Sequence, residues 1–168
     1  MAYEQHIQSA ESIAARCAIV TLSDTRTRET DKSGNRINEL LTQAGHVVAE
    51  SRILPDDPAQ LESLLRELLA RDDLDVILTN GGTGISRRDQ TIDVLERNLQ
   101  RPLHGFGELF RMLSWQQIGS GAMLTRAVAG ITNGKLIFAM PGSTKAVELA
   151  MEKLILPEIR HLIFELRK

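Results

Sequence analysis

The sequence predicts an α/β fold, a three-layer α/β/α sandwich whose sheet is mainly parallel. Short apolar segments alternate along the chain with stretches in which apolar residues recur at helical spacing. Residues 16–23 and 74–78 form almost continuous apolar runs, which are typical of parallel strands covered on both faces. Asn133-Gly134 separates two short apolar runs and indicates a hairpin, so one antiparallel strand joins the parallel ones.

Length and composition favour one globular domain. The chain has 168 residues, of which 42% are hydrophobic, and this is enough for a single core. Residues 1–15 are polar, and we expect them to form an N-terminal arm beside a single domain at 16–168. No internal repeat, linker or low-complexity segment divides that domain.

Charge, cysteine content and hydropathy exclude several classes of function. The net charge of −2 comes from mixed signs without a basic stripe, so we expect no nucleic-acid partner. Cys17 is the only cysteine and lies in an apolar strand, which excludes an intrachain disulfide and suits a reducing compartment. No apolar run approaches membrane-spanning length, and no signal peptide is evident. These features predict a cytoplasmic protein with no membrane partner.

Strands and helices alternate in the first half of the chain. The strand at 16–23 leads into a polar loop at 24–34, and the helix that follows ends at Gly45. A second strand at 46–54 precedes the clearest amphipathic leucine stripe of the chain, a helix with Asp57 as its N-cap and proline in its first turn. This half therefore predicts two strand–helix units.

The second half continues the alternation. The expected elements are a strand at 74–78, a glycine loop at 79–91, a helix with apolar residues from Ile92 to Leu99, a helix at 105–114, strands at 127–132 and 135–140, and a last helix that begins at 141–145, is interrupted at Pro157 and runs to Leu166.

The glycine loop at 79–91 is the first candidate for a ligand site. It lies between a strand and a helix, an arrangement that aims backbone N–H groups at an anion, and its glycines let the main chain lie against a phosphate. Threonine and serine hydroxyls add donors, and Arg87 and Arg88 add charge. Asp89 either caps the helix or holds a metal, since an acid otherwise repels an anion. As a pattern alone, the loop is equally consistent with a tight turn after a central strand.

Other loops at the same edge of the sheet favour a site over a simple turn, because ligands of such sheets bind outside the carboxyl ends of the strands. The residues expected at this edge are Ser23, Asp24, Asp31, Ser33, Gly34, Asp56, Gly81, Gly82, Thr83, Gly84, Asp89, Thr91, Pro141, Gly142, Ser143 and Lys145. Asp57 has a capping role, which leaves Asp56 as an acid without a structural role at the end of its strand.

Several motifs, in order along the chain, resemble those of one family. They are Thr79-Asn80-Gly81-Gly82-Thr83-Gly84 with Arg88-Asp89-x-Thr91, then Gly105-Phe106-Gly107-Glu108, Arg126-Ala127-Val128-Ala129-Gly130 and Pro141-Gly142-Ser143-Thr144-Lys145-Ala146. Over nearly its whole length the chain resembles the MoaB/MogA family of molybdenum cofactor biosynthesis proteins, and its details are most similar to the MoaB branch. Eukaryotic relatives of that family are the G domains of gephyrin and of the plant cofactor-insertion protein.

The resemblance implies a trimeric or hexameric α/β/α protein that binds molybdopterin and can contact other proteins of the pathway. Active members adenylylate the terminal phosphate of molybdopterin with Mg-ATP and release pyrophosphate. By matching motif, Asp56 and Asp89 correspond to two acids that the active enzymes require, and Glu108 falls among the substrate-binding positions. Many adenylylating members have Asn-Pro or Gln-Pro after Pro-Gly, where this chain has Ser143-Thr144.

The implied reaction calls for a divalent cation, because both substrates are polyanions and the pocket itself adds carboxylates. Asp56 and Asp89 are expected to hold or orient Mg²⁺, directly or through water. The amides of residues 81–84, with Ser143 and Lys145, are expected to fix the phosphates. The attacking phosphate is already ionised, so no general base is needed. The alternatives are a non-catalytic molybdopterin carrier or scaffold of the same pathway and an unrelated nucleotide-binding regulator.

Overall fold

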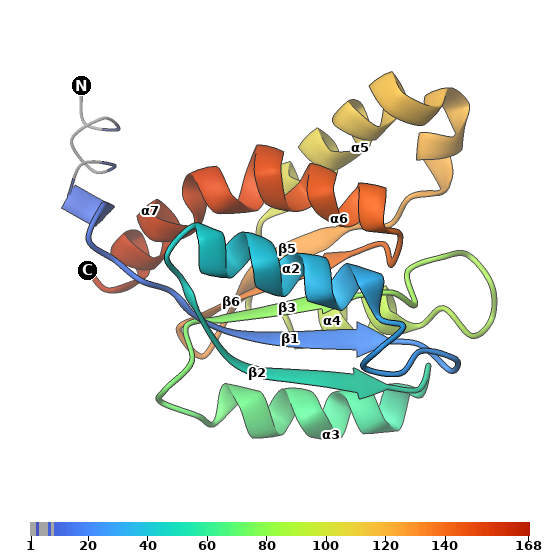
Figure 1. The fold of residues 1–168 in the computed structure, drawn as a ribbon, viewed down its shortest axis with the longest axis horizontal. Helices are drawn as coiled ribbons and strands as arrows, with labels where there is room; N and C mark the ends of the chain where they lie inside the picture. The colour runs from blue at the N-terminus through green and yellow to red at the C-terminus, as the bar shows by residue number, and fades with distance from the viewer. Residues whose placement is uncertain (1–2, 4–6, 8) are drawn as a thin grey trace.

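Six strands form one sheet in the part of the chain that the structure, a computed structural model, describes: residues 3, 7 and 9–168. Their order is β2-β1-β3-β6-β5-β4, with β5 antiparallel to its two neighbours and the other pairs parallel (Figure 1). The strands are β1 (Arg16–Leu22), β2 (Val47–Leu54), β3 (Val76–Asn80), β4 (Arg101–Pro102), β5 (Val128–Thr132) and β6 (Lys135–Met140). Residues 1, 2, 4–6 and 8 of the expected arm lie outside the described residues.

Helices cover both faces of the sheet. They are α2 (Lys32–Gln43), α3 (Pro58–Leu69), α4 (Thr91–Asn98), α5 (His104–Ile118), the 3₁₀ helix η1 (Gly119–Leu124), α6 (Thr144–Ala150), the π-helical η2 (Met151–Ile155) and α7 (Leu156–Leu166). One core cluster packs α2, α5, α6 and α7 on one face, and a second packs α3 and α4 on the other. Successive residues of β1 alternate between them, Cys17 and Ile19 in the first and Ala18 and Val20 in the second. The predicted three-layer sandwich is confirmed.

Several predicted boundaries are confirmed. The strand β6 spans the expected residues, and Asn133 and Gly134 have the positive φ angles, 50° and 70°, that a tight hairpin turn requires. Asp57 caps α3 by accepting hydrogen bonds from the N–H groups of Ala59 at 2.8 Å and Gln60 at 3.1 Å. The last helix is interrupted as expected: the π-helical η2 precedes the proline, which lies in the first turn of α7 and has no N–H to donate.

The loop after β1 is shorter than predicted. Ser33 and Gly34 were expected in it, but the helix α2 already begins at Lys32, so both lie in its first turn. The reason is Asp31, whose side chain caps the helix by accepting from the N–H of Gly34 at 3.0 Å.

Three further boundaries differ because pairing or packing overrides the local pattern. The strand β3 begins two residues later than expected and takes in Thr79 and Asn80, which pair with the last residues of β6. The helix α5 extends to Ile118, beyond the expected end at residue 114. The two-residue β4 forms where no element was expected, by pairing with β5.

The order of the strands creates a crevice at the carboxyl edge of the sheet. The strands β1 and β3 are neighbours, but α2, which follows β1, covers one face, while α4, which follows β3, covers the other. The loops that leave these two strands therefore diverge, and ligands of open α/β sheets bind at such a point. In Figure 1 the loop between β3 and α4 projects beyond this edge.

At the amino edge of the sheet, the buried carboxylate of Asp75 pairs with two partly exposed arginines. Asp75 accepts hydrogen bonds from the backbone N–H and the guanidinium of Arg16, all at 2.9 Å, and from Arg167 at 3.0 Å. Burial alone would raise the pKa of Asp75, but these bonds outweigh it and lower the pKa to about 2. Of the expected arm, Tyr3 lies against α7, where its hydroxyl donates to Glu158. No helix within the described residues has the length and apolar character needed to cross a membrane.

His46 is a buried, neutral side chain at the start of β2. Its Nδ1 accepts a hydrogen bond from the backbone N–H of Ala15 at 3.0 Å, which ties the segment before β1 to β2. Burial, with the nearby charge of Arg160, lowers the pKa of His46 from 6.5 to about 4.

We predict that acid destabilises the protein through His46. Its folded-state pKa is depressed, so its contribution to stability is complete above pH 6.5 and is lost as the pH falls from 6.5 towards about 4. His46→Asn retains an acceptor but cannot take up a proton. In urea titrations across this pH range, the unfolding free energy of the wild type should fall more steeply than that of the variant. Parallel pH dependences would contradict the prediction.

Candidate functional site

Gly81, the first residue after β3, brings three strand ends together. Its φ is +95°, and its N–H donates to the carbonyl oxygen of Met140 at the end of β6, at 3.1 Å. A Cβ at this position would lie 2.3 Å from the carbonyl oxygen of Leu22 at the end of β1. Only glycine permits both the positive φ and this backbone approach.

The next part of the glycine loop packs directly against the two candidate acids. A Cβ at Gly82 would lie 2.2 Å from Oγ1 of Thr91 and 2.8 Å from Oδ1 of Asp56. A Cβ at Gly84 would lie 2.7 Å from Oδ2 of Asp89. Asp56, which follows β2, and Asp89, which belongs to the loop itself, therefore lie against glycines two residues apart.

Arg126, which sequence reasoning missed as a site residue, holds the glycine loop in place. Its Nε donates to the carbonyl oxygens of Thr83 at 3.2 Å and Gly84 at 3.1 Å, and its Nη2 donates to that of Asp89. Its Nη1 also forms an ion pair with Asp93 of α4 at 3.1 Å. One guanidinium thus satisfies three loop carbonyls and fixes the path of the loop.

Asp89 stabilises the end of the loop. It accepts hydrogen bonds from the backbone N–H of Ser86 at 3.0 Å and from its hydroxyl at 2.5 Å. These bonds hold the pKa of Asp89 below its usual value. The helix α4 has Gln90 at its N-cap without a side-chain bond, so Asp89 does not cap that helix.

Asp56 lies in a cluster of acids. Its backbone N–H donates to Oδ1 of Asp24 at 3.1 Å, and Asp24 forms an ion pair with Arg88 at 2.5 Å. Burial first, and then the charges of Asp24 and Asp89, raise the pKa of Asp56, while Arg88 lowers it. Oδ1 of Asp56 is buried and has no hydrogen-bond partner among the described residues.

A buried polar network joins β3, β1 and α2 behind the loop. Nδ2 of Asn80 donates to Oγ1 of Thr21 at 2.9 Å, and that hydroxyl donates to Oδ2 of Asp31 at 2.6 Å. Ser33 and Gly34 are buried beside Asp31, so their part in a site is to support the loop rather than to face solvent.

The glycine loop borders a cavity of about 510 Å³. It is lined by Leu22, Ser23, Arg26, Gly81, Gly82, Thr83, Gly84, Asp89, Leu124, Thr125, Pro141, Gly142 and Ser143. We call it the glycine-loop cavity. Nine of the expected residues line it, while Leu22, Arg26, Leu124 and Thr125 were missed. Asp56 and Thr91 line a much smaller cavity with Arg88 on the other side of the loop.

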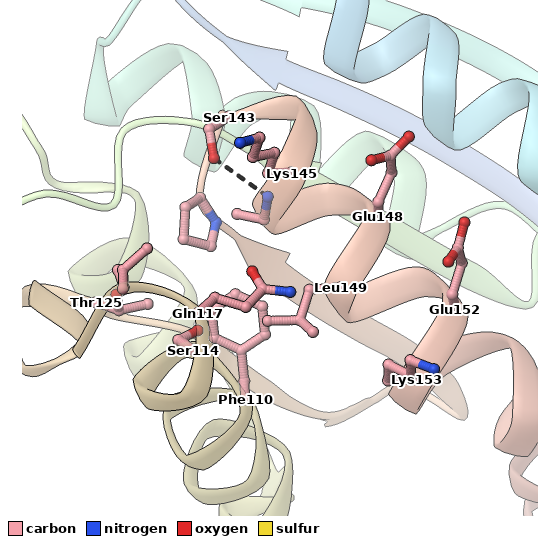
Figure 2. A pocket seen from close by; sticks show the side chains of 13 residues that line it. Phe110, Ser114, Gln117, Thr125, Ser143, Lys145, Glu148, Leu149, Glu152 and Lys153 are labelled. Carbon is pink, nitrogen blue, oxygen red and sulfur yellow. Dashed lines mark hydrogen bonds between the residues drawn. The ribbon is translucent and has the colours of Figure 1, made fainter.

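A second cavity of about 640 Å³ opens between α5 and α6, and we call it the α5–α6 cavity. Figure 2 shows its apolar floor at Phe110 and Leu149, with Gln117, Lys145 and Lys153 around it. Thr125, Pro141 and Ser143 line both cavities, so the two adjoin. Ser143 also caps α6 by accepting from the N–H of Ala146 at 3.2 Å.

Glu108 lies apart from these cavities. It is exposed on α5 and lines neither of them. Within the described residues, no group of three or more histidine, cysteine or acidic side chains is arranged to hold a metal ion by itself. The structure therefore brings together the loops after β1, β3 and β6, with Asp56 behind the glycine loop and Asp89 in front of it.

Comparisons with known proteins agree with this architecture. A family model described as a probable molybdopterin binding domain matches residues 18–161. A molybdenum cofactor biosynthesis protein B of Bacillus anthracis is 53% identical over 154 residues, covering 91% of each chain. A crystal structure of a molybdenum cofactor biosynthesis protein B has a TM-score of 0.90 at 52% identity, covering 92% of this chain and 97% of that one. The tungsten cofactor synthesizing protein MoaB from Pyrococcus furiosus has a TM-score of 0.82 at 36% identity, with coverages of 92% and 98%.

We predict that Gly81→Ala destabilises the fold, because the new Cβ would meet the carbonyl oxygen of Leu22 and strain a positive φ. Urea unfolding should show a loss of about 2 kcal/mol or more. Gly105→Ala is the matched control: it lies in α5 with nothing within 4 Å of its Cβ position, and it should change stability by less than about 1 kcal/mol. Equal effects of the two substitutions would contradict the packing described at Gly81.

Proposed function

This chain belongs to the MoaB/MogA family of molybdenum cofactor biosynthesis proteins, and on that premise we propose that it binds molybdopterin and adenylylates its terminal phosphate with Mg-ATP. The proposed products are adenylylated molybdopterin and pyrophosphate. The observation that carries this proposal is Oδ1 of Asp56, a buried carboxylate oxygen that lies against the glycine loop and has no hydrogen-bond partner in the part of the chain that the structure describes.

The donor set around Asp56 fits Mg²⁺. An unpaired buried carboxylate oxygen is costly unless something compensates it, and the neighbouring charges of Asp24 and Asp89 increase that cost. Mg²⁺ is typically held by one or two carboxylates together with substrate phosphates and water, so a larger protein cluster is not required. We infer that Asp56 and Asp89 would hold it, directly or through water.

The two adjoining cavities suit the two parts of the ligands. We infer that Ser143 and glycine-loop amides other than that of Gly81, which donates to Met140, bind phosphates in the glycine-loop cavity. The α5–α6 cavity, with an apolar floor at Phe110 and Leu149 and with Lys145 at its edge, has the mixed lining that a heterocyclic ring with an anionic tail requires.

The reaction is an adenylyl transfer, a displacement at the α-phosphorus of ATP. The chain promotes it by aligning the two substrates. An oxygen of the terminal phosphate of molybdopterin forms a bond with the α-phosphorus of ATP, and the bond from that phosphorus to the bridging oxygen breaks as pyrophosphate leaves. The attacking oxygen is already ionised, so the residues of the site need only orient it towards the α-phosphorus. When bound, Mg²⁺ supplies neutralisation of the phosphate charges.

We also propose that the chain forms a homo-oligomer, a trimer or hexamer, through an apolar face of α5. This α5 apolar face comprises Leu109, Met112, Trp115 and Ile118, which are 47%, 52%, 61% and 60% exposed. Exposed apolar side chains gathered on one element mark protein interfaces, and tryptophan is enriched there. The helix η1 follows this face and ends at Leu124, which lines the glycine-loop cavity, so assembly would place a second copy near the site.

We predict that Asp56→Asn lowers adenylylation by about 100-fold or more while the fold and molybdopterin binding remain, because the substitution removes a charge but little volume. The assay incubates protein with molybdopterin, ATP and Mg²⁺ and detects adenylylated pterin and pyrophosphate by mass spectrometry. Asp72→Asn, an exposed acid before β3, is the matched control.

Near-normal adenylylation by the Asp56→Asn protein would show that Asp56 does not have the assigned role. A wild-type protein that binds molybdopterin but forms no adenylylated product would support the alternative, a non-catalytic carrier of the same pathway.

We predict that Trp115→Glu converts the oligomer to monomer, because a charge would be buried at the centre of the α5 apolar face. Sedimentation velocity at micromolar protein measures the mass. Gln116→Glu adds the same charge to the neighbouring exposed position of α5 and should leave the mass unchanged. A monomeric wild type, or an unchanged mass for Trp115→Glu, would refute the assignment.

A further inference from the structure

Arg26 is a cation in the wall of the glycine-loop cavity that the sequence did not single out. It lies in the loop between β1 and α2, and its side chain is 30% exposed. Its Nη2 donates to the carbonyl oxygen of Gly142 at 2.8 Å, across the cavity wall. Its Nη1 donates to Oγ of Ser33 and forms an ion pair with Oδ1 of Asp31 at 3.3 Å.

The other arginines near the loop do not line this cavity. Arg88 forms an ion pair with Asp24 at 2.5 Å, and Arg87 lines a different surface depression together with Arg126. Among the described residues that line the glycine-loop cavity, the charged side chains are Arg26 and Asp89. Asp89 carries a negative charge and cannot attract a phosphate, so among these residues Arg26 is the side chain whose charge suits one.

On the basis of the proposed function, we propose that Arg26 is the residue that binds a ligand phosphate in the glycine-loop cavity and so selects phosphorylated ligands. A guanidinium bonds a phosphate through two parallel N–H donors, and such charge-assisted bonds are stronger than a bond to a neutral carbonyl. A phosphate oxygen can therefore replace the carbonyl of Gly142 as the acceptor for Nη2 with a gain in free energy.

The surrounding network permits this exchange without leaving a buried acid unpaired. If Arg26 turns towards a ligand, Oδ1 of Asp31 keeps the hydrogen bond from the N–H of Gly34 at 3.0 Å. Oδ2 of Asp31 keeps the hydrogen bond from Thr21 at 2.6 Å. Asp31 also caps α2, so the positive end of that helix continues to compensate its charge.

The test measures binding of inorganic pyrophosphate by isothermal titration calorimetry. We expect Arg26→Gln to weaken binding by about tenfold or more, and Arg26→Lys to weaken it by about three- to tenfold because lysine keeps the charge but not the paired donors. Arg87→Gln is the matched control and should bind within about twofold of the wild type. The affinity for pyrophosphate should fall less steeply with increasing salt concentration for Arg26→Gln than for the wild type.

The salt dependence separates a direct contact from a loop-supporting role. A guanidinium that contacts the phosphate contributes to the change of affinity with salt concentration, whereas one that only supports the loop does not. If Arg26→Gln weakens binding but keeps the salt dependence of the wild type, Arg26 acts by supporting the loop and the proposal is overturned. Urea midpoints identify unfolded variants, and Arg26→Lys carries the test if Arg26→Gln does not fold.

The outcomes distinguish this inference from the proposed function. If the wild type binds pyrophosphate and Arg26→Gln binds it within twofold, the role of Arg26 is refuted while the proposed adenylylation stands. If the wild type binds neither pyrophosphate nor ATP in the presence of Mg²⁺, both are refuted.

Discussion

The site depends on how closely backbone meets backbone at the carboxyl ends of β1, β3 and β6. A side chain at Gly81 would collide with the carbonyl oxygen of Leu22, and a Cβ at Gly142 would lie 3.1 Å from the Cα of Gly81. Without side chains between them, the loops that leave these strands share one small area, and their peptide groups form the wall of a cavity. Charged residues surround this wall. Arg126 donates hydrogen bonds to the glycine loop, and Asp56 lies against Gly82 of the same loop.

The architecture could be predicted from the sequence because local patterns and tertiary packing agree over most of the chain. The continuous apolar run of β1 is buried on both faces, as parallel strands require, and Asp57 caps its helix through bonds to residues only two and three positions away. The predicted helix and strand boundaries are wrong where a contact with a distant part of the chain determines them. Asp31 starts α2 early because it is held by Thr21 in a strand, and β4 has two residues, too few for any periodic pattern.

Much of the candidate site could also be predicted, because the topology of a parallel sheet fixes which loops meet. The arginines could not. In sequence, Arg26 and Arg126 are ordinary loop residues, and their roles arise from carbonyl groups 116 and 43 positions away along the chain. Asp56 could be selected by elimination, since the next residue has a capping role. Asp24 contributes to the raised pKa of Asp56, and the contact between the two residues is seen only in the folded chain.

The ion pairs of Asp75 at the amino edge determine where the C-terminus leaves the fold. Asp75 joins Arg16 at the start of β1 to Arg167 near the other terminus, and Tyr3 packs on the same last helix. Figure 1 shows the start of β1 and the end of α7 at this edge, opposite the loop between β3 and α4. A polypeptide fused to the C-terminus would therefore emerge away from the cavity. An affinity tag added there would not cover the ligand site.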